Sequence, residues 1–284
     1  MATELDPALS DIELAAKLLR HAGTLAHTIR AASLGGLRDG GRIKSNASDF
    51  VTAADLAAEK YIFMQLRSAR PDDSIVGEEG AGFTGTSGRA WVIDPVDGTF
   101  NFASGSTYWC AALALAQLPA GTSPTPETLS DAEVLLGAVY QHQEDKLWLG
   151  GSAAPATLNG RPIHIDDRHE LSELSAGTYL HPTWLADSTA AMPWQQAAVL
   201  PATLRMLGSG SCDLARVAQG ELGVWFQHSC PSWDWLPGKG IVRAGGGDTG
   251  VVRVNGLDWF MAGPAAAVAQ LRAALKRGVP AVEI

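Results

Sequence analysis

The sequence predicts an α+β protein built as two α/β lobes, with residues 1–150 in the first lobe and residues 151–284 in the second. Apolar residues recur at helical spacing near both ends of the chain. Between them, short apolar segments of strand length alternate with glycine- and proline-rich turns. A chain of 284 residues is long enough for one large domain or two closely joined domains.

In the first lobe, the sequence predicts two helices that cover one sheet. Apolar side chains repeat at helical spacing over residues 5–30, and a second helix is expected over residues 55–70, where Pro71 ends it. Strands are expected at residues 50–52, 74–76, 91–94, 108–117, 134–141 and 146–149. Residues 34–41 and 119–130 are rich in glycine, proline or threonine and are predicted to be loops.

The second lobe is expected to start near Gly150. Strands are predicted at residues 162–165, 175–179, 222–227 and 251–255, with a strand-like segment at 205–211. Helices are predicted over residues 211–219, 233–245 and 264–276. The segment between residues 179 and 205 contains several prolines and is predicted to be a loop.

Composition limits the partners that the protein can have. The formal net charge is -9 and the pI about 5.2, which argues against nucleic acid or an anionic membrane as the main partner. An acidic protein can still bind phosphate where metal ions supply the positive charge. The longest apolar stretch, residues 109–118, is far shorter than the ~20 residues of a spanning helix. Acidic residues in the first positions of the chain do not resemble a signal peptide.

The cysteines point to a reducing compartment. There are three, Cys110, Cys212 and Cys230, an odd number without regular spacing. Neither a disulfide framework nor a zinc site fits this pattern. Together with the composition, it predicts a soluble cytoplasmic protein.

One motif organises the chain. It reads Trp91-Val92-Ile93-Asp94-Pro95-Val96-Asp97-Gly98-Thr99-Phe100-Asn101-Phe102. Pro95 should keep Asp94 extended at the end of a strand and break the strand ladder, so that the chain turns toward Asp97. Gly98 allows an unusual backbone torsion, and a helical turn starting at Thr99 would offer free N–H groups to an anion. Carboxylates, amides and a hydroxyl in this order suit a divalent cation that holds a phosphate.

Acids elsewhere in the chain strengthen this interpretation. Glu78 follows a short strand in Gly77-Glu78-Glu79-Gly80, and Asp234 opens a predicted helix. If Glu78, Asp94, Asp97 and Asp234 converge, their repulsion requires metal ions, and oxygen ligands without His or Cys favour magnesium over zinc. Spacing alone also allows scattered surface acids and an ordinary turn at residues 94–98. For Asp55, simple complementation of a helix dipole is the default interpretation.

The chain resembles the inositol monophosphatase family of metal-dependent, lithium-sensitive phosphomonoesterases. The resemblance covers nearly the whole chain and rests on Gly77-Glu78-Glu79, the segment 91–102, Trp233-Asp234 followed by three glycines, and Lys44 with the segment Asp49-Phe50-Val51-Thr52-x-x-Asp55. It implies a layered αβαβα sandwich of the type shared with fructose-1,6-bisphosphatase, and a homodimer. The first lobe would carry most of the metal ligands, and the second would supply Asp234 and the substrate pocket.

The resemblance also implies two or three Mg²⁺ ions. Glu78, Asp94 and the carbonyl of Val96 would hold the first. Asp94, Asp97 and Asp234 would hold the second, and a third, weaker ion would lie near Glu78.

Catalytic roles are implied for Glu78, Thr99 and Asp55, with Asp55 orienting Thr99 so that Thr99 positions the attacking water. The amides of Gly98 and Thr99 would hold phosphate oxygens. The implied substrate contacts are Val96, Asp97, Gly98, Thr99, Ser209, Gly210, Gln227 and Asp234. The implied substrate is a small polyol or sugar monophosphate, with inositol monophosphate as the family default.

The substrate pocket departs from the family pattern. Gly210-Ser211 stands where alanines are common, and Gln227 stands where many members carry an acid. Histidinol phosphate is the second candidate substrate, although Gln227 offers its amine no charge. Fructose bisphosphate and a nucleotide 3′-phosphate are less favoured, because no basic cluster stands out for a second phosphate. A non-catalytic regulatory or binding member of the family is the alternative from a different class.

Overall fold

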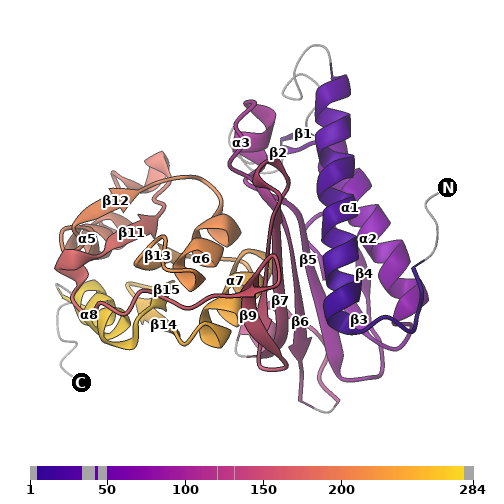
Figure 1. Ribbon diagram of the computed structural model, residues 1–284. Helices are drawn as coiled ribbons and strands as arrows, with labels where there is room; N and C mark the ends of the chain where they lie inside the picture. Colours follow the sequence, from indigo (N-terminus) through magenta and orange to yellow (C-terminus); the bar gives the residue numbers. More distant parts are fainter. Residues whose placement is uncertain (1–4, 34–41, 44–49, 120, 131, 278–284) are drawn as a thin grey trace.

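The computed structural model describes residues 5–33, 42–43, 50–119, 121–130 and 132–277. Helices and sheets alternate in five layers across the molecule, in the order α, β, α, β, α (Figure 1). This arrangement confirms the predicted α+β class and the layered sandwich. None of the helices in the described ranges is both long and apolar enough to cross a membrane.

The first outer layer consists of α1 (Asp11–Ala32) and α2 (Ala53–Ala69), which pack on each other and on one sheet (Figure 1). α1 starts later than the apolar periodicity predicts. Ser10 caps it, because its side chain accepts from the Glu13 amide while the Glu13 side chain accepts from the Ser10 amide. This capping box satisfies two N–H groups that have no partner within the helix.

An eight-stranded sheet forms the second layer, with strand order β10-β9-β8-β7-β6-β5-β3-β4. Its strands are β3 (Ser74–Gly77), β4 (Gly82–Phe83), β5 (Arg89–Asp97), β6 (Cys110–Gln117), β7 (Glu133–Gln141), β8 (Lys146–Gly151), β9 (Ala154–Leu158) and β10 (Arg161–Pro162). β3 and β5 are parallel and the other neighbours antiparallel. A separate pair joins β1 (Arg42–Ile43) to β2 (Phe50–Val51).

The first sheet extends beyond residue 150. A tight turn at Asn159 and Gly160, both with positive φ, folds β10 back onto β9. The strand predicted at residues 162–165 for the second lobe is therefore wrong: only Arg161–Pro162 is a strand, and it belongs to the first sheet. The division of the chain into two domains near residue 150 stays a prediction.

The remaining layers come from the C-terminal half. The five-stranded second sheet has the order β12-β11-β13-β15-β14. Its strands are β11 (Ser175–Thr178), β12 (Thr203–Arg205), β13 (Val224–His228), β14 (Asp248–Val254) and β15 (Leu257–Gly263). Between the two sheets lie α6 (Gly210–Ala218) and α7 (Ser232–Ala244), and the last layer is α5 (Ser188–Ala198) with α8 (Ala265–Leu275) (Figure 1). Short helices complete the described chain: α3 (Thr99–Ala103), α4 (Pro126–Ser130), η2 (His142–Glu144), η3 (Leu171–Glu173) and η4 (Pro182–Trp184).

Sequence reasoning missed α4, α5, β4, β9 and β15, and of the strand-like segment predicted at residues 205–211 only Arg205 lies in a strand, at the end of β12. Pro126 opens α4, a position where a missing N–H costs nothing, so a predicted loop contains a helix. Pro193 lies inside α5 and hid its helical pattern, although tertiary packing buries this proline against its neighbours.

Among the described residues, three large apolar cores hold the layers together, and a fourth, smaller cluster lies around Val96, Phe102 and Trp109. One lies between the first sheet and α1 with α2, and another between the second sheet and α5 with α8. The largest lies between the two sheets and contains Trp148, Trp225 and Trp235, each almost fully buried. Burying a large apolar side chain contributes roughly 1.5–3 kcal/mol, so the tryptophans make this middle core a main link between the sheets.

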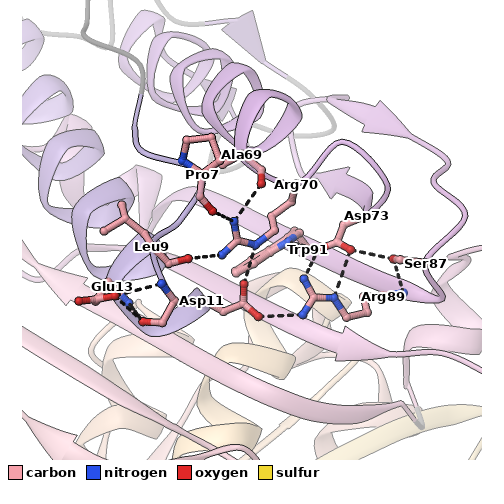
Figure 2. A network of polar contacts seen from close by, with 11 residues as sticks. Pro7, Leu9, Asp11, Glu13, Ala69, Arg70, Asp73, Ser87, Arg89 and Trp91 are labelled. Carbon is pink, nitrogen blue, oxygen red and sulfur yellow. Dashed lines mark hydrogen bonds and ion pairs between the residues drawn. The ribbon is translucent and has the colours of Figure 1, made fainter.

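A polar network fixes the start of β5 (Figure 2). Arg89 donates to both Asp73, at 2.6 Å, and Asp11, at 2.8 Å, while Arg70 donates to Asp11 at 2.7 Å. Trp91 Nε1 donates to Asp73 at 2.9 Å, so this buried carboxylate has several donors. The network joins α1, α2 and β5 at the end of β5 opposite Asp97. It holds one end of the strand whose other end carries the candidate site.

Candidate active site

The end of β5 places two carboxylates around a bulge. Asp94 pairs with Ala112 and Asp97 with Cys110, and the register between β5 and β6 shifts between these pairs. Pro95 was expected to break the ladder. The strand instead continues to Asp97, and the interruption is local, because a bulge accommodates a residue without an N–H. Within the bulge, the Val96 amide donates to Asp94 Oδ1 at 3.1 Å.

Gly98 makes the sharp turn that follows. Its φ is +91°, a left-handed conformation that favours glycine, and α3 starts at the next residue as expected. A Cβ on Gly98 would lie 3.0 Å from the Gly208 carbonyl oxygen. The absence of a side chain therefore also lets the segment before α6 approach the end of β5.

Asp55 holds Thr99 in place. The Thr99 hydroxyl lies 3.2 Å from Asp55 Oδ1 and 3.0 Å from the Val96 carbonyl oxygen. The other oxygen of Asp55 accepts from the amide and the hydroxyl of Thr52, the residue that caps α2. The default interpretation of Asp55 as a partner of the helix dipole is thus incomplete, because this carboxylate also binds across to Thr99. Lys44 and Asp49, named with the same motif, lie outside the described residues.

Asp97 meets the N-terminus of α6 from the other half of the chain. The Ser211 amide donates to Asp97 Oδ2, and the Ser209 side chain caps α6 by accepting from the Cys212 amide at 3.3 Å. The free N–H groups of a helix start favour a negative charge at this position. Both Ser209 and Gly210, predicted substrate contacts, lie at this helix start.

Glu78, Asp97 and Asp234 line one cavity, and Asp94 is buried close enough for their charges to act on it. Burial raises the pKa of Asp94 well above its usual range, and the charges of Glu78, Asp97 and Asp234 raise it further, together with a side-chain hydrogen bond to Glu78. Burial also raises the pKa of Asp97 to about 6, against the opposing hydrogen bonds of Ser211 and Ser209. The interpretation as scattered surface acids does not fit carboxylates that sense one another in this way.

The donor set fits hard divalent cations. Within the described ranges, no three His, Cys, Asp or Glu side chains are already arranged as a metal-binding group. The fit rests instead on chemistry, because buried carboxylates that repel one another lose that repulsion when a cation lies between them. Since all four side chains offer oxygen, the set suits magnesium better than zinc.

The carboxylates open into a cavity of about 650 Å³ between the two halves of the chain. Predicted site residues that line it are Glu78, Asp97, Gly98, Thr99, Ser209, Gly210, Gln227 and Asp234. Asp55, Asp94 and Val96 are buried and support the lining residues from beneath. The site brings together both halves of the chain, as the implied roles require.

Sequence reasoning missed part of the lining: Phe100, Asn101, Tyr179, His181, Pro182, Met206, Leu207, Gly208 and Asp213. Asn101 could have been found as part of the central motif, and its amide donates to the Leu207 carbonyl at 2.7 Å, which ties α3 to the segment before α6. Asp213, one turn into α6, is buried, and burial raises its pKa to about 8. Nothing in the sequence indicated that Tyr179 and Met206 would line the cavity.

Solved structures share this fold. The extragenic suppressor protein SuhB from Bartonella henselae superposes with a TM-score of 0.80 at 24% identity, covering 94% of this chain and 99% of that one. An IMPase from Thermotoga maritima gives a TM-score of 0.76 at 22% identity, covering 94% and 97%. The fold and the acid-lined cavity thus define the class of this protein: αβαβα sandwiches of the inositol monophosphatase and SuhB type.

Sequence relatives name the family. The model of the inositol monophosphatase family matches residues 9–282. Nus factor SuhB of Xylella fastidiosa is 31% identical, over 72% of this chain and 70% of that protein. Inositol monophosphatase 1 of Solanum lycopersicum is 33% identical, over 70% of this chain and 71% of that protein. The chain belongs to the inositol monophosphatase family, as the motifs predicted.

Without metal, the protein should lose stability as the pH rises from about 4 to about 6. Burial raises the pKa of both Asp55 and Asp97 to about 6. Below the unfolded-state pKa near 4 both states are protonated. Between the two pKa values only the unfolded state ionises, so each group lowers the free energy of unfolding by up to about 1.4 kcal/mol per pH unit.

Chemical denaturation across this window, with a chelator present, measures the effect. Excess magnesium should reduce the loss of stability near pH 6, since cations favour the ionised carboxylates. A midpoint that does not change with pH in the chelator would contradict the prediction.

Proposed function

We propose that this protein is a metal-dependent phosphomonoesterase. The observation that carries the proposal is the buried carboxylate Asp94, whose charge is opposed by three further acids at one end of a cavity. Family membership supports phosphatase chemistry. An inositol-1-monophosphatase of Rhizobium meliloti is 30% identical over 70% of this chain and 71% of that protein.

The proposed metal ligands are Glu78, Asp94, Asp97, Asp234 and the carbonyl of Val96. Two or three Mg²⁺ ions held there would neutralise the phosphoryl oxygens and lower the pKa of a bound water. The end of β5 and the start of α6 both line the cavity beside these carboxylates, so the phosphate is expected to lie there.

Thr99 and Asp55 position the attacking water. The hydroxyl of Thr99 donates one proton, and Asp55 Oδ1 at 3.2 Å and the Val96 carbonyl at 3.0 Å both compete for it. With that proton held, the lone pairs of Thr99 are left to accept a hydrogen bond from water. The amides of Gly98 and Thr99, at the start of α3, are the proposed donors to the phosphate oxygens.

The proposed substrate is a small phosphorylated alcohol, and inositol monophosphate is the reference ester for the family. Histidinol phosphate is the second candidate. Gln227 lines the cavity and can bind a hydroxyl or an amine without charge. A cytoplasmic location, a homodimer and the absence of a nucleic acid partner stay predictions.

A non-catalytic binding role is the alternative. It is favoured by the name Nus factor SuhB, which several similar proteins carry. Against it, no metal-ligand position of the family motif is lost in this chain.

Phosphate release from a panel of esters separates the two functions. The panel comprises inositol 1-phosphate, histidinol phosphate, glycerol phosphate and fructose 1,6-bisphosphate, each with magnesium and with chelator. We expect release that the chelator abolishes. No metal-dependent release from any ester would support the binding role instead.

A further inference from the structure

Three residues of the second sheet lie at the same edge of the cavity. β12, β11 and β13 are adjacent and parallel, with Gly177 paired to Arg205 and Thr178 to Phe226 (Figure 1). The next residues along these strands are Met206, Tyr179 and Gln227, and all three line the cavity. Ligands commonly bind at the carboxyl ends of parallel strands, so this edge is placed to contact the alcohol part of the ester.

This edge is apolar to an extent that a polyol site does not require. Among the described residues, nine large hydrophobic side chains are exposed, and three of them line this cavity. They are Tyr179, Met206 and Phe100, with 36%, 49% and 43% of their surface exposed. Phe100 directly follows Thr99, and both residues line the cavity.

The residues around Tyr179 hold its ring in place. The ring meets the His181 ring edge to face, with centroids 6.4 Å apart. His181 Nδ1 lies 2.8 Å from the Thr183 hydroxyl and caps η4, which starts at Pro182. A ring held by a rigid turn loses little freedom when a ligand covers it.

Hydroxyls and apolar surface match poorly. A hydroxyl laid against the ring face of Tyr179 or against Met206 loses its water and gains no hydrogen bond. An apolar ring face there removes both its own surface and that of the protein from water. Gln227, next to Tyr179, is uncharged and can satisfy only a few polar atoms, and the other polar groups that line the cavity near this edge are His181 and the buried Asp213.

We infer that the ester hydrolysed at this site has an alcohol with an apolar ring face next to the ester oxygen. Tyr179 and Met206 are the specificity-determining residues for that face, and a fully hydroxylated ring is the poorer substrate. This inference rests on the proposed phosphomonoesterase function and names the substrate class for it.

Cyclohexyl phosphate and inositol 1-phosphate test the inference, because they share one ring size and differ in hydroxyls. With magnesium, kcat/KM should be at least about tenfold higher for cyclohexyl phosphate, mainly through a lower KM. Tyr179→Ala and Met206→Ala should each bring the ratio of the two kcat/KM values toward one. Tyr179→Phe, which keeps the ring, should retain the preference.

Met64→Ala is the matched control, since Met64 is 59% exposed on α2 and does not line the cavity. It should leave both the ratio and the activity unchanged. A preference for inositol 1-phosphate, or a ratio that Tyr179→Ala does not alter, would overturn the inference. A change of oligomeric state in Tyr179→Ala, measured by light scattering, with the ratio intact, would make this edge an interface instead.

The inference and the proposed function fail differently. If neither ester is hydrolysed while the family panel is also inert, the phosphatase proposal has failed. Titration calorimetry with the two esters then still decides the inference, because tighter binding of cyclohexyl phosphate supports the apolar edge. Equal or weaker binding than inositol 1-phosphate refutes it.

Discussion

Asp94→Asn should abolish phosphatase activity while making the metal-free protein more stable. The wild-type carboxyl is buried, its pKa is raised well above the usual range, and three acids oppose its charge. Asparagine has the same shape, keeps an oxygen for the Val96 amide, and carries no charge. We expect a loss in kcat/KM of roughly 10³-fold, the scale of several kcal/mol of lost charge stabilisation.

Whereas the substitution lowers kcat/KM, it should raise the free energy of unfolding of the metal-free protein. Burial and the charges of Glu78, Asp97 and Asp234 oppose the ionised form of Asp94 in the folded wild type, and the uncharged variant avoids this cost. Thermal unfolding with chelator and with magnesium measures the change in stability. The rise in Tm on adding magnesium should be smaller for Asp94→Asn than for the wild type. Asp72→Asn, at an exposed acid, is the control. Unchanged phosphatase activity in Asp94→Asn would refute the metal site.

Gly137→Ala should destabilise the protein and impair the site from a distance. Gly137 lies in β7, and a Cβ there would lie 2.0 Å from the carbonyl oxygen of Pro237 in α7. Gly240 in α7 meets the same strand, since its Cβ would lie 3.2 Å from the Gly137 nitrogen. The helix therefore rests directly on the sheet backbone, and backbone atoms cannot rotate away.

We expect Gly137→Ala to lower the free energy of unfolding by roughly 3 kcal/mol, the upper range for overpacking. α7 carries Asp234 in its first turn, so a displaced helix should also lower kcat of the folded enzyme by about tenfold or more. Denaturant unfolding and single-turnover assays measure the two effects. Gly82→Ala is the matched control, because no atom lies within 4 Å of the added Cβ. Equal stabilities of the two variants would contradict the close packing of α7.

Local signals were sufficient for most elements. α2, β3, β6, β7, α6 and α7 lie within a few residues of their predicted positions, because caps, prolines and hydrophobic periodicity act over one or two turns. The errors occurred where packing overrides local preference. Pro193 is tolerated inside α5, which packs on α8 and shares a core with the second sheet, and β10 pairs with the first sheet because of the turn at Asn159.

The candidate site also has one part that follows from local sequence and another that depends on tertiary packing. The motif from Asp94 to Thr99 carries its own geometry, since a bulge, a left-handed glycine and a helix start follow one another along the chain. Asp55 was found through the family motif. Its contact with Thr99 requires α2 to be packed beside the end of β5.

By itself, the sequence determined the α+β class and the family, and it predicted the acids of the site and the departure at Gln227. These follow from residue types and from short-range backbone preferences, which the chain carries at every position. Only the tertiary structure decided that Tyr179 and Met206 join Gln227 at one edge of the cavity. The register of parallel strands depends on the packing of the whole second sheet, so residues far apart in the sequence become neighbours only when that sheet is formed.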